Sequence, residues 1–294
     1  MIKNNIKLSV VIVFYNMKRE AVRTLYSLTT KYQTDINESD YEVIIVDSNS
    51  SQPLDQEWVE SIQSNFIYRY VESPWPSPCR AMNIGIDISR SESIVCMIDG
   101  ARILSPGVLS KMILANNLFS NAFVQTIAMH IGKKLQNISV EEGYNQEVED
   151  KLIASIDWQQ DGYQLFNISC LAASSKGGFL NPIPESNCFC VPKRKLVELN
   201  GFDENFKSIG GGIVNHDVLN RILEDEEIQP VTLLGEASFH QFHGGVATNV
   251  PMVEHPMKIF LNEYFELRKK PFKPSIRRSF FLGDLPENTR KFIS

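Results

Sequence analysis

Long hydrophobic runs, an excess of positive charge and a cysteine framework are all missing from this 294-residue chain. Its apolar runs have the length of strands and fall short of the roughly 20 residues that a membrane helix needs. A net charge of -6 and a pI of about 5.5 argue against nucleic acid as the main partner, because a phosphate backbone requires a basic face. The five cysteines form no regular pattern, and Met1–Asn5 carries no apolar export signal. We therefore expect a reduced, cytoplasmic protein.

Three common nucleotide or catalytic loops are also absent. No Gly-x-Gly-x-x-Gly follows the first predicted strand, so the fingerprint of dinucleotide binding is missing. The chain has neither a Walker-type Gly-Lys-Ser/Thr loop nor the Gly-x-Ser-x-Gly turn of many hydrolases. These absences weaken dehydrogenase, P-loop and hydrolase interpretations.

What the first half does contain is a regular alternation of strand and helix. The hydrophobic pattern predicts strands over 8–14, 41–46, 66–71 and 94–98 and helices over about 21–28, 58–64, 80–89 and 105–119. Such a rhythm predicts a parallel sheet that is covered by helices on both faces. The second half is less regular, with strands predicted over 122–131, 162–171, 187–191 and 231–234 and helices over 141–156, 193–199 and about 256–269. Residues 174–185 are rich in Gly, Ser and Pro and predict a loop.

Polar residues follow three of the predicted buried strands. Asp99 ends the apolar run 94–98 and precedes Gly100, Asn16 follows the first strand, and Asp47 follows the second. Ligands of open α/β sheets bind at the carboxyl ends of the strands. This pattern therefore predicts a nucleotide site at one edge of the sheet.

Four segments give the chain a resemblance to a known family. They are the first strand with its Asn16, the Val-Asp-x-x-Ser turn at 46–50, Arg-Ala-Met-Asn-Ile-Gly at 80–85, and Gly-Phe-Asp-Glu-x-Phe at 201–206. In this order and spacing, over about residues 7–245, the chain resembles an inverting family-2 glycosyltransferase of the GT-A fold. The resemblance implies an α/β fold with a mostly parallel central sheet flanked by helices. It divides one fused domain into a nucleotide-sugar half at 1–110, an acceptor-binding and catalytic half at 111–255, and a C-terminal helix and tail at 256–294.

The resemblance also implies the residues that bind a nucleoside-diphosphate sugar, with a UDP-type donor favoured. These donor-binding candidates are Phe14, Asn16, Asp47, Arg80, Asn83, Asp99 and Arg102. Two of them have ordinary structural alternatives. Asp47 also fits a helix cap or an Asx-turn, and Arg80 fits a plain surface position.

The metal site of the family is only partly present. The usual Asp-x-Asp reads Asp99-Gly100-Ala101, so the second carboxylate is missing, and Arg102 follows at once. One hypothesis is weak or no metal dependence, with the Arg102 guanidinium pairing with the diphosphate oxygens. The alternative keeps Mn²⁺ or Mg²⁺ on Asp99 and His243. In a continuous strand His240 and His243 point to opposite faces, so we expect only one of them, His243, to face the site.

The remaining catalytic prediction concerns the general base. Inverting enzymes of this type use a carboxylate, usually within a Glu-Asp pair after a Gly-rich turn. Here Asp217 follows the turn 210–212, but His216 replaces the Glu, so the pair is not matched, and a helix cap is the structural alternative for Asp217. Glu185 and Asn187, after the predicted loop, are the candidates for acceptor contacts.

The resemblance therefore implies transfer of a sugar with inversion to a hydroxyl of a glycan or lipid-linked saccharide, in surface polysaccharide synthesis. The alternative is a non-catalytic nucleotide- or glycan-binding relative in a synthesis complex, which Ala101 favours. The basic and aromatic tail at 268–281 predicts either peripheral contact with a membrane or packing in a homodimer.

Overall fold

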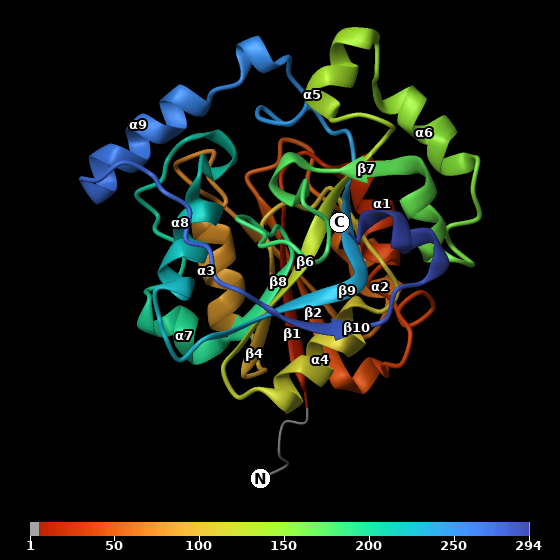
Figure 1. The fold of residues 1–294 in the computed structure, drawn as a ribbon, viewed down its shortest axis with the longest axis horizontal. Coiled ribbons are helices and arrows are strands. Elements are labelled where there is room, and N and C mark those ends of the chain that lie inside the picture. The colour runs from red at the N-terminus through yellow and green to blue at the C-terminus, as the bar shows by residue number, and fades with distance from the viewer. Residues whose placement is uncertain (1–5, 294) are drawn as a thin grey trace.

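A computed structural model describes residues 6–293 of the chain. The expected absence of an export signal concerns Met1–Asn5, which lies outside the described residues. Within that range a single mixed sheet runs in the order β10-β9-β6-β8-β4-β1-β2-β3, with β5 on β9 and β7 on β6 (Figure 1). The strands are β1 (Leu8–Phe14), β2 (Tyr41–Ser48), β3 (Phe66–Val71), β4 (Ser93–Met97), β5 (Arg102–Leu104), β6 (Ala122–Ile131), β7 (Ser169–Leu171), β8 (Phe189–Pro192), β9 (Gln229–His240) and β10 (Phe280–Gly283).

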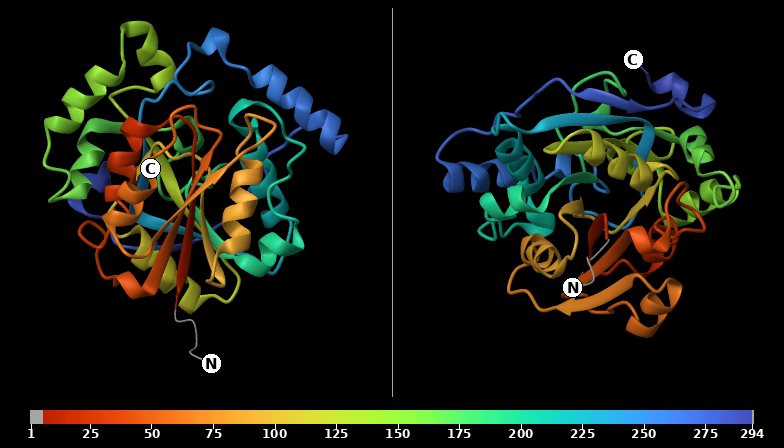
Figure 2. Two further views of the ribbon diagram at one scale, coloured as in Figure 1. Left: turned by 180° about the vertical axis from the view of Figure 1, so that it is seen from behind. Right: turned by 90° about the horizontal axis from the view of Figure 1, so that it is seen from below.

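Helices cover both faces of this sheet (Figures 1 and 2). They are α1 (Lys18–Tyr26), α2 (Gln56–Ile62), α3 (Cys79–Ile88), α4 (Val108–Leu118), α5 (Gln136–Ser139), α6 (Gln146–Ala154), α7 (Lys193–Glu198), α8 (Val214–Leu223) and α9 (Met257–Arg268). No helix among residues 6–293 combines the length and the apolar character that crossing a bilayer would require.

Two apolar layers lie on opposite faces of the central strands because successive strand residues alternate between the faces. In β1, Val10 and Ile12 belong to one buried apolar cluster with residues of α1, α2 and α4, whereas Val11 and Val13 belong to another with residues of α3, α7, α8 and α9. Every residue of β1 and β2 is buried, as expected for strands covered on both sides. The predicted α/β architecture is therefore confirmed.

The sheet brings the ends of four strands to one edge. Strands β4, β1, β2 and β3 are parallel neighbours, so Asp99 and Asn16, which follow β4 and β1, lie at the same edge as Asp47, which is the last residue but one of β2. Strand β8 is antiparallel to β4, with Cys96 opposite Phe189. The start of β8 therefore lies beside the end of β4, and Glu185 comes just before β8 at this same edge.

Strand β9 changes partners along its length. Its first part pairs with β10, and its last part pairs with β5, where Arg102 lies opposite His240. Between the two parts Gly235 takes a φ of 72°, and a Cβ there would lie 2.3 Å from the backbone oxygen of Asp284. Only glycine tolerates both conditions easily. The bend lets β9 deliver His240 to the same edge as Asp99.

Two sequence predictions differ from the structure. Residues 162–171 are not one strand: Gly162–Ile168 forms a 3₁₀ helix, and only Ser169–Leu171 pairs with β6. Asp161 accepts a hydrogen bond from the Tyr163 backbone N–H and starts the helical turn. Gly162 and Leu165 are buried at a spacing of three, which suits a 3₁₀ helix and not a strand.

The second difference concerns the C-terminal tail, where the sequence analysis predicts no strand. Residues Phe280–Gly283 form β10, a parallel edge strand on β9, and the Phe280 ring stacks on Phe119 with centroids 5.0 Å apart. Phe280 and Phe281 still expose about half of their surface, at 56% and 45%. Membrane contact and homodimer packing of this edge stay predictions.

Candidate functional site

Asp99 lies in a tight turn directly after β4. Its Oδ1 accepts a hydrogen bond from the Ala101 backbone N–H at 3.0 Å, and the Gly100 carbonyl accepts one from Thr24. A Cβ on Gly100 would lie 2.4 Å from the Phe14 ring. The turn thus packs directly on the fully buried Phe14, and a glycine is needed there to hold Asp99 at the edge of the sheet.

Two histidines meet this carboxylate. His240 Nε2 lies 3.2 Å from Asp99 Oδ2, and His243 Nε2 lies 3.2 Å from His240 Nε2 and 3.9 Å from Asp99 Oδ1. Asp99 and His243 are partly exposed, whereas His240 is 1% exposed. One carboxylate and two imidazoles therefore converge on a single point at the carboxyl end of the sheet.

The expectation that His240 and His243 point to opposite faces is wrong. That expectation assumes a continuous strand, but β9 ends at His240. Beyond it the chain leaves the extended conformation, and Gly244 has a φ of 83°. Strand alternation therefore does not apply across this turn, and both rings face Asp99.

The spacing of these three groups fits a divalent cation. Ligand atoms bound at about 2.1 Å and at right angles to one another lie about 3 Å apart. The ligand atoms of Asp99, His240 and His243 all lie within 4.8 Å of one another, and two of the three separations are 3.2 Å. Imidazole together with carboxylate suits Mn²⁺ better than Mg²⁺, which prefers oxygen ligands alone.

The cluster is electrostatically biased toward a charged carboxylate and neutral imidazole. Burial alone would raise the pKa of Asp99, but His243, Arg102 and His240 together hold it well below the usual range. Burial lowers the pKa of His240 to about 4, although Asp99 opposes this shift. An ionised carboxylate and an unprotonated imidazole are the forms that bind metal ions.

Arg102 lies beneath Asp99. Its Nε is 3.3 Å from Asp99 Oδ2, the residue is 4% exposed, and neither Nε nor Nη1 has a hydrogen-bond partner among the described residues. A guanidinium so well covered acts on the carboxylate beside it and presents little surface to a ligand. The hypothesis that Arg102 pairs with a diphosphate stays a prediction: the burial of the side chain argues against it, whereas the unpartnered Nη1 argues for a ligand there.

The turns after β1 and β2 are tied together. Asn16 has a φ of 53°, which asparagine tolerates, and its Oδ1 accepts hydrogen bonds from the Ser51 backbone N–H and hydroxyl. Asp47 Oδ2 accepts from the Leu54 N–H at 2.7 Å. Asp47 Oδ1 is buried without a hydrogen-bond partner among residues 6–293, as expected of a carboxylate that awaits a ligand.

The two predicted donor residues of α3 differ in their surroundings. Arg80, in the first turn of the helix, is exposed. Asn83 is engaged with the Gly201–Phe206 turn: its Nδ2 donates to the Phe202 carbonyl at 2.8 Å and to Glu204, and its Oδ1 accepts from the Phe202 N–H. Two of the family segments are thus joined physically through Asn83, whose amide is already satisfied by the protein.

Asp217 is held by two arginines. Its oxygens accept from Arg221 Nε at 2.8 Å and from Arg268 Nε and Nη2 at 2.6 and 2.7 Å, and the residue is 1% exposed. Asp217 and Asn83 both line a cavity of about 630 Å³ on the α3–α8–α9 side. The prediction that Asp217 is the base stays a prediction, and this ion-pair network occupies both oxygens that a base would use.

Glu185 and Asn187 both precede β8 and contact the first turn of α8. Glu185 Oε1 accepts from Asn215 Nδ2 at 3.4 Å, and Oε2 lies 3.5 Å from His216 Nε2. The Asn187 side-chain oxygen is also 3.4 Å from Asn215 Nδ2. These contacts are long, and Glu185 is about a quarter exposed, so its carboxylate is available to a ligand.

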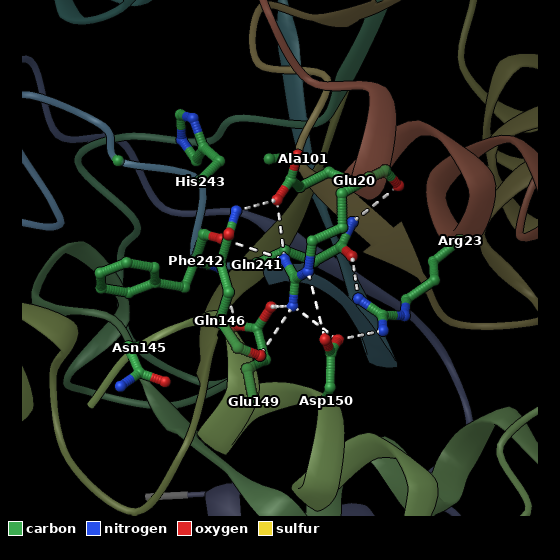
Figure 3. Close-up of polar contacts among 12 residues, drawn as sticks. Glu20, Arg23, Ala101, Asn145, Gln146, Glu149, Asp150, Gln241, Phe242 and His243 are labelled. Carbon is green, nitrogen blue, oxygen red and sulfur yellow. Dashed lines mark hydrogen bonds and ion pairs between the residues drawn. The ribbon is translucent and has the colours of Figure 1, made fainter. Parts of the chain in front are cut away.

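A polar cluster between α1 and α6 supports the His243 loop (Figure 3). Glu149, fully buried, accepts the Phe242 N–H at 2.7 Å, and Arg19 donates to the Phe242 carbonyl at 3.1 Å and to Glu20 and Asp150. Burial raises the pKa of Glu149 to about 7, against the effect of Arg19. The sequence does not predict that Glu149 is buried, because it lies in a helix whose acidic residues are typical of a solvent-exposed face.

Comparisons with known proteins bear on the fold and the family of the chain. Solved structures with a similar fold include TarS 1–349 of S. aureus, at 14% identity and a TM-score of 0.53 over 80% of this chain and 60% of that one. TarS 1–349 in complex with UDP-GlcNAc matches at 13% and 0.54 over 89% and 73%. Mannosyltransferase PcManGT from Pyrobaculum calidifontis in complex with GDP-Man and Mn²⁺ matches at 15% and 0.50 over 91% and 66%.

The chain thus spans 60% of the length of TarS 1–349, and these likenesses confirm the expected GT-A fold. A search of curated proteins gives no match. Residues 9–248 match the sequence family described as "Glycosyltransferase like family 2". That stretch contains the Asp99–His240–His243 cluster and covers most of the chain, so the protein belongs to the family-2-like glycosyltransferases.

Proposed function

We propose that this protein transfers a sugar from a nucleoside-diphosphate donor of the UDP type to a saccharide hydroxyl, with inversion, in surface polysaccharide synthesis. The observation that carries the proposal is the convergence of Asp99, His240 and His243 at the carboxyl edge of the sheet in a chain of this family. Similar folds bind UDP, UDP-GlcNAc, and GDP-Man with Mn²⁺, which supports a nucleotide-sugar donor and a divalent cation.

The proposed cation site consists of Asp99, His240 and His243. When bound, a divalent cation neutralises the charge that develops on a leaving diphosphate. His240 takes the place of the carboxylate that Ala101 removes from the usual motif. Arg102 stabilises the ionised form of Asp99 from below. Asp47, with its unpaired Oδ1, is the proposed contact to the nucleoside.

We propose Glu185 as the general base in place of Asp217. A base must present a free carboxylate oxygen to the acceptor hydroxyl. Glu185 does so at the edge that Asp99 occupies, whereas both oxygens of Asp217 are paired with arginine. Two polar atoms beside it, Asn215 Oδ1 and His216 Nδ1, lack hydrogen-bond partners among the described residues, which favours a ligand at this position.

The proposed step is a single displacement. The acceptor oxygen forms a bond to the anomeric carbon of the donor sugar as the bond from that carbon to the diphosphate oxygen breaks. Glu185 takes the hydroxyl proton, and the electron pair of the broken bond leaves with the nucleoside diphosphate. Asn187 is the proposed neighbouring contact to the acceptor.

Calorimetric titration tests donor and cation together. UDP, GDP and dTDP are each titrated with Mn²⁺ and again with EDTA. We expect binding of UDP with Mn²⁺ and at least tenfold weaker binding with EDTA. Full binding in EDTA would favour the Arg102 hypothesis over the cation site. No nucleotide binding under any condition would overturn the proposal.

A matched pair of isosteric variants tests the base. With the sugar donor whose nucleotide binds, Glu185→Gln should lower release of nucleoside diphosphate on the order of 100-fold or more at unchanged donor affinity. Asp217→Asn, compared per folded molecule, should retain activity. Nucleotide binding without turnover in the unaltered protein would favour the non-catalytic alternative, which Ala101 also supports.

A further inference from the structure

A buried chain of three side chains lies behind the proposed cation site. Asn249, Gln136 and His240 are 7%, 0% and 1% exposed. They come from three separate segments: the loop after β9, the start of α5 and the end of β9. Because none of them is accessible to water, each polar atom depends on a protein partner, and the pattern of partners fixes how each group is oriented.

The orientation of Asn249 is fixed by three donors. Its Oδ1 accepts the backbone N–H groups of His243, Gly244 and Gly245 at 3.1, 3.0 and 2.9 Å. Only a carbonyl oxygen can accept three N–H groups, so the amide nitrogen of Asn249 must face the other way. That nitrogen donates to Gln136 Oε1 at 2.8 Å.

The orientation of the Gln136 amide follows from this hydrogen bond with Asn249 and from a second one, with His240. Its Nε2 donates to the His240 backbone carbonyl at 3.2 Å, a contact that an amide oxygen cannot make. Gln136 Oε1 therefore acts as an acceptor, and it lies 2.7 Å from His240 Nδ1. Two acceptors do not hold each other at that distance, so His240 Nδ1 must carry the hydrogen.

A hydrogen on Nδ1 determines the state of Nε2, the other ring nitrogen of His240. A neutral imidazole has a single N–H, so with the hydrogen on Nδ1 the Nε2 of His240 presents a lone pair. That lone pair faces Asp99 Oδ2 and His243 Nε2, each at 3.2 Å. His240 Nε2 and Asp99 Oδ2 are then two acceptors with no hydrogen between them, so their approach is favourable only when a cation, or the N–H of His243, lies beside both.

We infer that Gln136 and Asn249 are positioning residues that select the Nδ1–H form of His240 and so prepare its Nε2 as a cation ligand. Asn249 also fixes the His243 loop through the same three N–H groups, so one side chain sets both histidines. Those N–H groups are occupied by Asn249 and are not free for a phosphate. This inference rests on the proposed cation site, but the form of His240 is a property of the metal-free protein.

Asn249, Gln136 and His240 form a hydrogen-bond relay, and two isosteric variants test whether this relay selects the form of His240 or only fills space. Both variants add one buried carboxylate, so the effect of burying a charge is matched between them. In Asn249→Asp the new carboxylate can still accept the three N–H groups but cannot donate to Gln136. We then expect the Gln136 amide to rotate so that its NH₂ donates to this carboxylate and to His240 Nδ1. Because Nδ1 must accept that hydrogen bond, the hydrogen of the imidazole moves to Nε2. In Gln136→Glu one oxygen of the new carboxylate still accepts from His240 Nδ1 and from Asn249, so the Nδ1–H form is kept, although the second oxygen replaces the NH₂ that donates to the His240 backbone carbonyl.

The first measurement is ¹⁵N NMR of the histidine rings in metal-free protein at pH 7.5, with His240 assigned among the five histidines by its absence in His240→Asn. We expect Nδ1–H in the unaltered protein and in Gln136→Glu, and Nε2–H in Asn249→Asp. An Nε2–H form in the unaltered protein overturns the inference, and this result does not depend on whether Asn249→Asp folds.

The second measurement is Mn²⁺ affinity, from the electron paramagnetic resonance signal of free Mn²⁺. We expect Asn249→Asp to bind Mn²⁺ 10- to 100-fold more weakly and Gln136→Glu to stay within about threefold of the unaltered protein. Equal affinities in folded Asn249→Asp and the unaltered protein overturn the inference. If the unaltered protein binds no Mn²⁺, the cation site of the proposed function fails, and the NMR result still decides the role of the relay.

Discussion

Replacing Asp217 by asparagine distinguishes a structural ion pair from a catalytic base. The carboxylate is 1% exposed and accepts three hydrogen bonds from Arg221 and Arg268. Asparagine has the same shape, but it is neutral and offers only one acceptor oxygen. Arg221 and Arg268, each about one-fifth exposed, would lose this buried counter-charge, and Arg268 would keep only its second ion pair, with Asp203 at 2.7 Å.

The magnitude follows from the cost of leaving a buried charge unpaired. Breaking such a pair from one side costs about 3–5 kcal/mol, and the partial exposure of the arginines favours the lower end, about 3 kcal/mol. The entropy of unfolding of about 2.1 cal/mol/K per residue gives roughly 0.6 kcal/mol/K for 294 residues. Asp217→Asn should therefore lower Tm by about 5 °C.

Differential scanning calorimetry measures this shift, and Glu142→Gln serves as the control. Glu142 pairs with Lys134 at 2.6 Å, but both side chains are more than half exposed. Its removal should change the free energy of unfolding by no more than about 0.5 kcal/mol. An unchanged Tm for Asp217→Asn, together with a loss of turnover of about 100-fold or more, would refute the structural role and restore Asp217 as the base.

Two further predictions concern residues away from the cation site. Asn83→Ala should lower the free energy of unfolding by about 1–3 kcal/mol, because the Phe202 N–H and carbonyl lose their partner. The Kd for UDP should stay within about twofold. A large rise in this Kd at unchanged Tm would show that Asn83 contacts the donor instead. Glu149, with a pKa of about 7 against an unfolded value of 4.5, binds more protons in the folded state, so the free energy of unfolding should fall as pH rises from about 4.5 to 7. In urea titrations across this range Glu149→Gln should lose that part of the decline, on the order of 1–3 kcal/mol, and an identical pH dependence in variant and unaltered protein would contradict the raised pKa.

The sequence by itself determined the elements and the edge at which the site lies. Strands β1 and β3 have the predicted bounds, and Asp99 and Asn16 follow strand ends as expected, whereas β2 extends two residues beyond its predicted end and includes Asp47. The sequence predicts these features because a strand buried on both faces needs a continuous apolar run. The residue after such a run therefore lies at or near the end of the strand.

Only the tertiary structure decided which side chains meet there. Whether His240 and His243 share a face depends on where β9 stops pairing, and this is set by its partners β5 and β6. Asp217 lies in the first turn of α8, as a base or a cap would, but Arg268 reaches it from α9, 51 residues later. Local periodicity carries no information about a partner at that separation.

The relay behind His240 shows the same limit most clearly. Asn249, Gln136 and His240 are each unremarkable in the sequence, and more than 100 residues separate Gln136 from the other two. Their roles follow from which donor faces which acceptor inside a space without water. Hydrophobic pattern and turn chemistry determine the scaffold one segment at a time, whereas hydrogen-bond direction in a buried site is set only when all the segments are packed together.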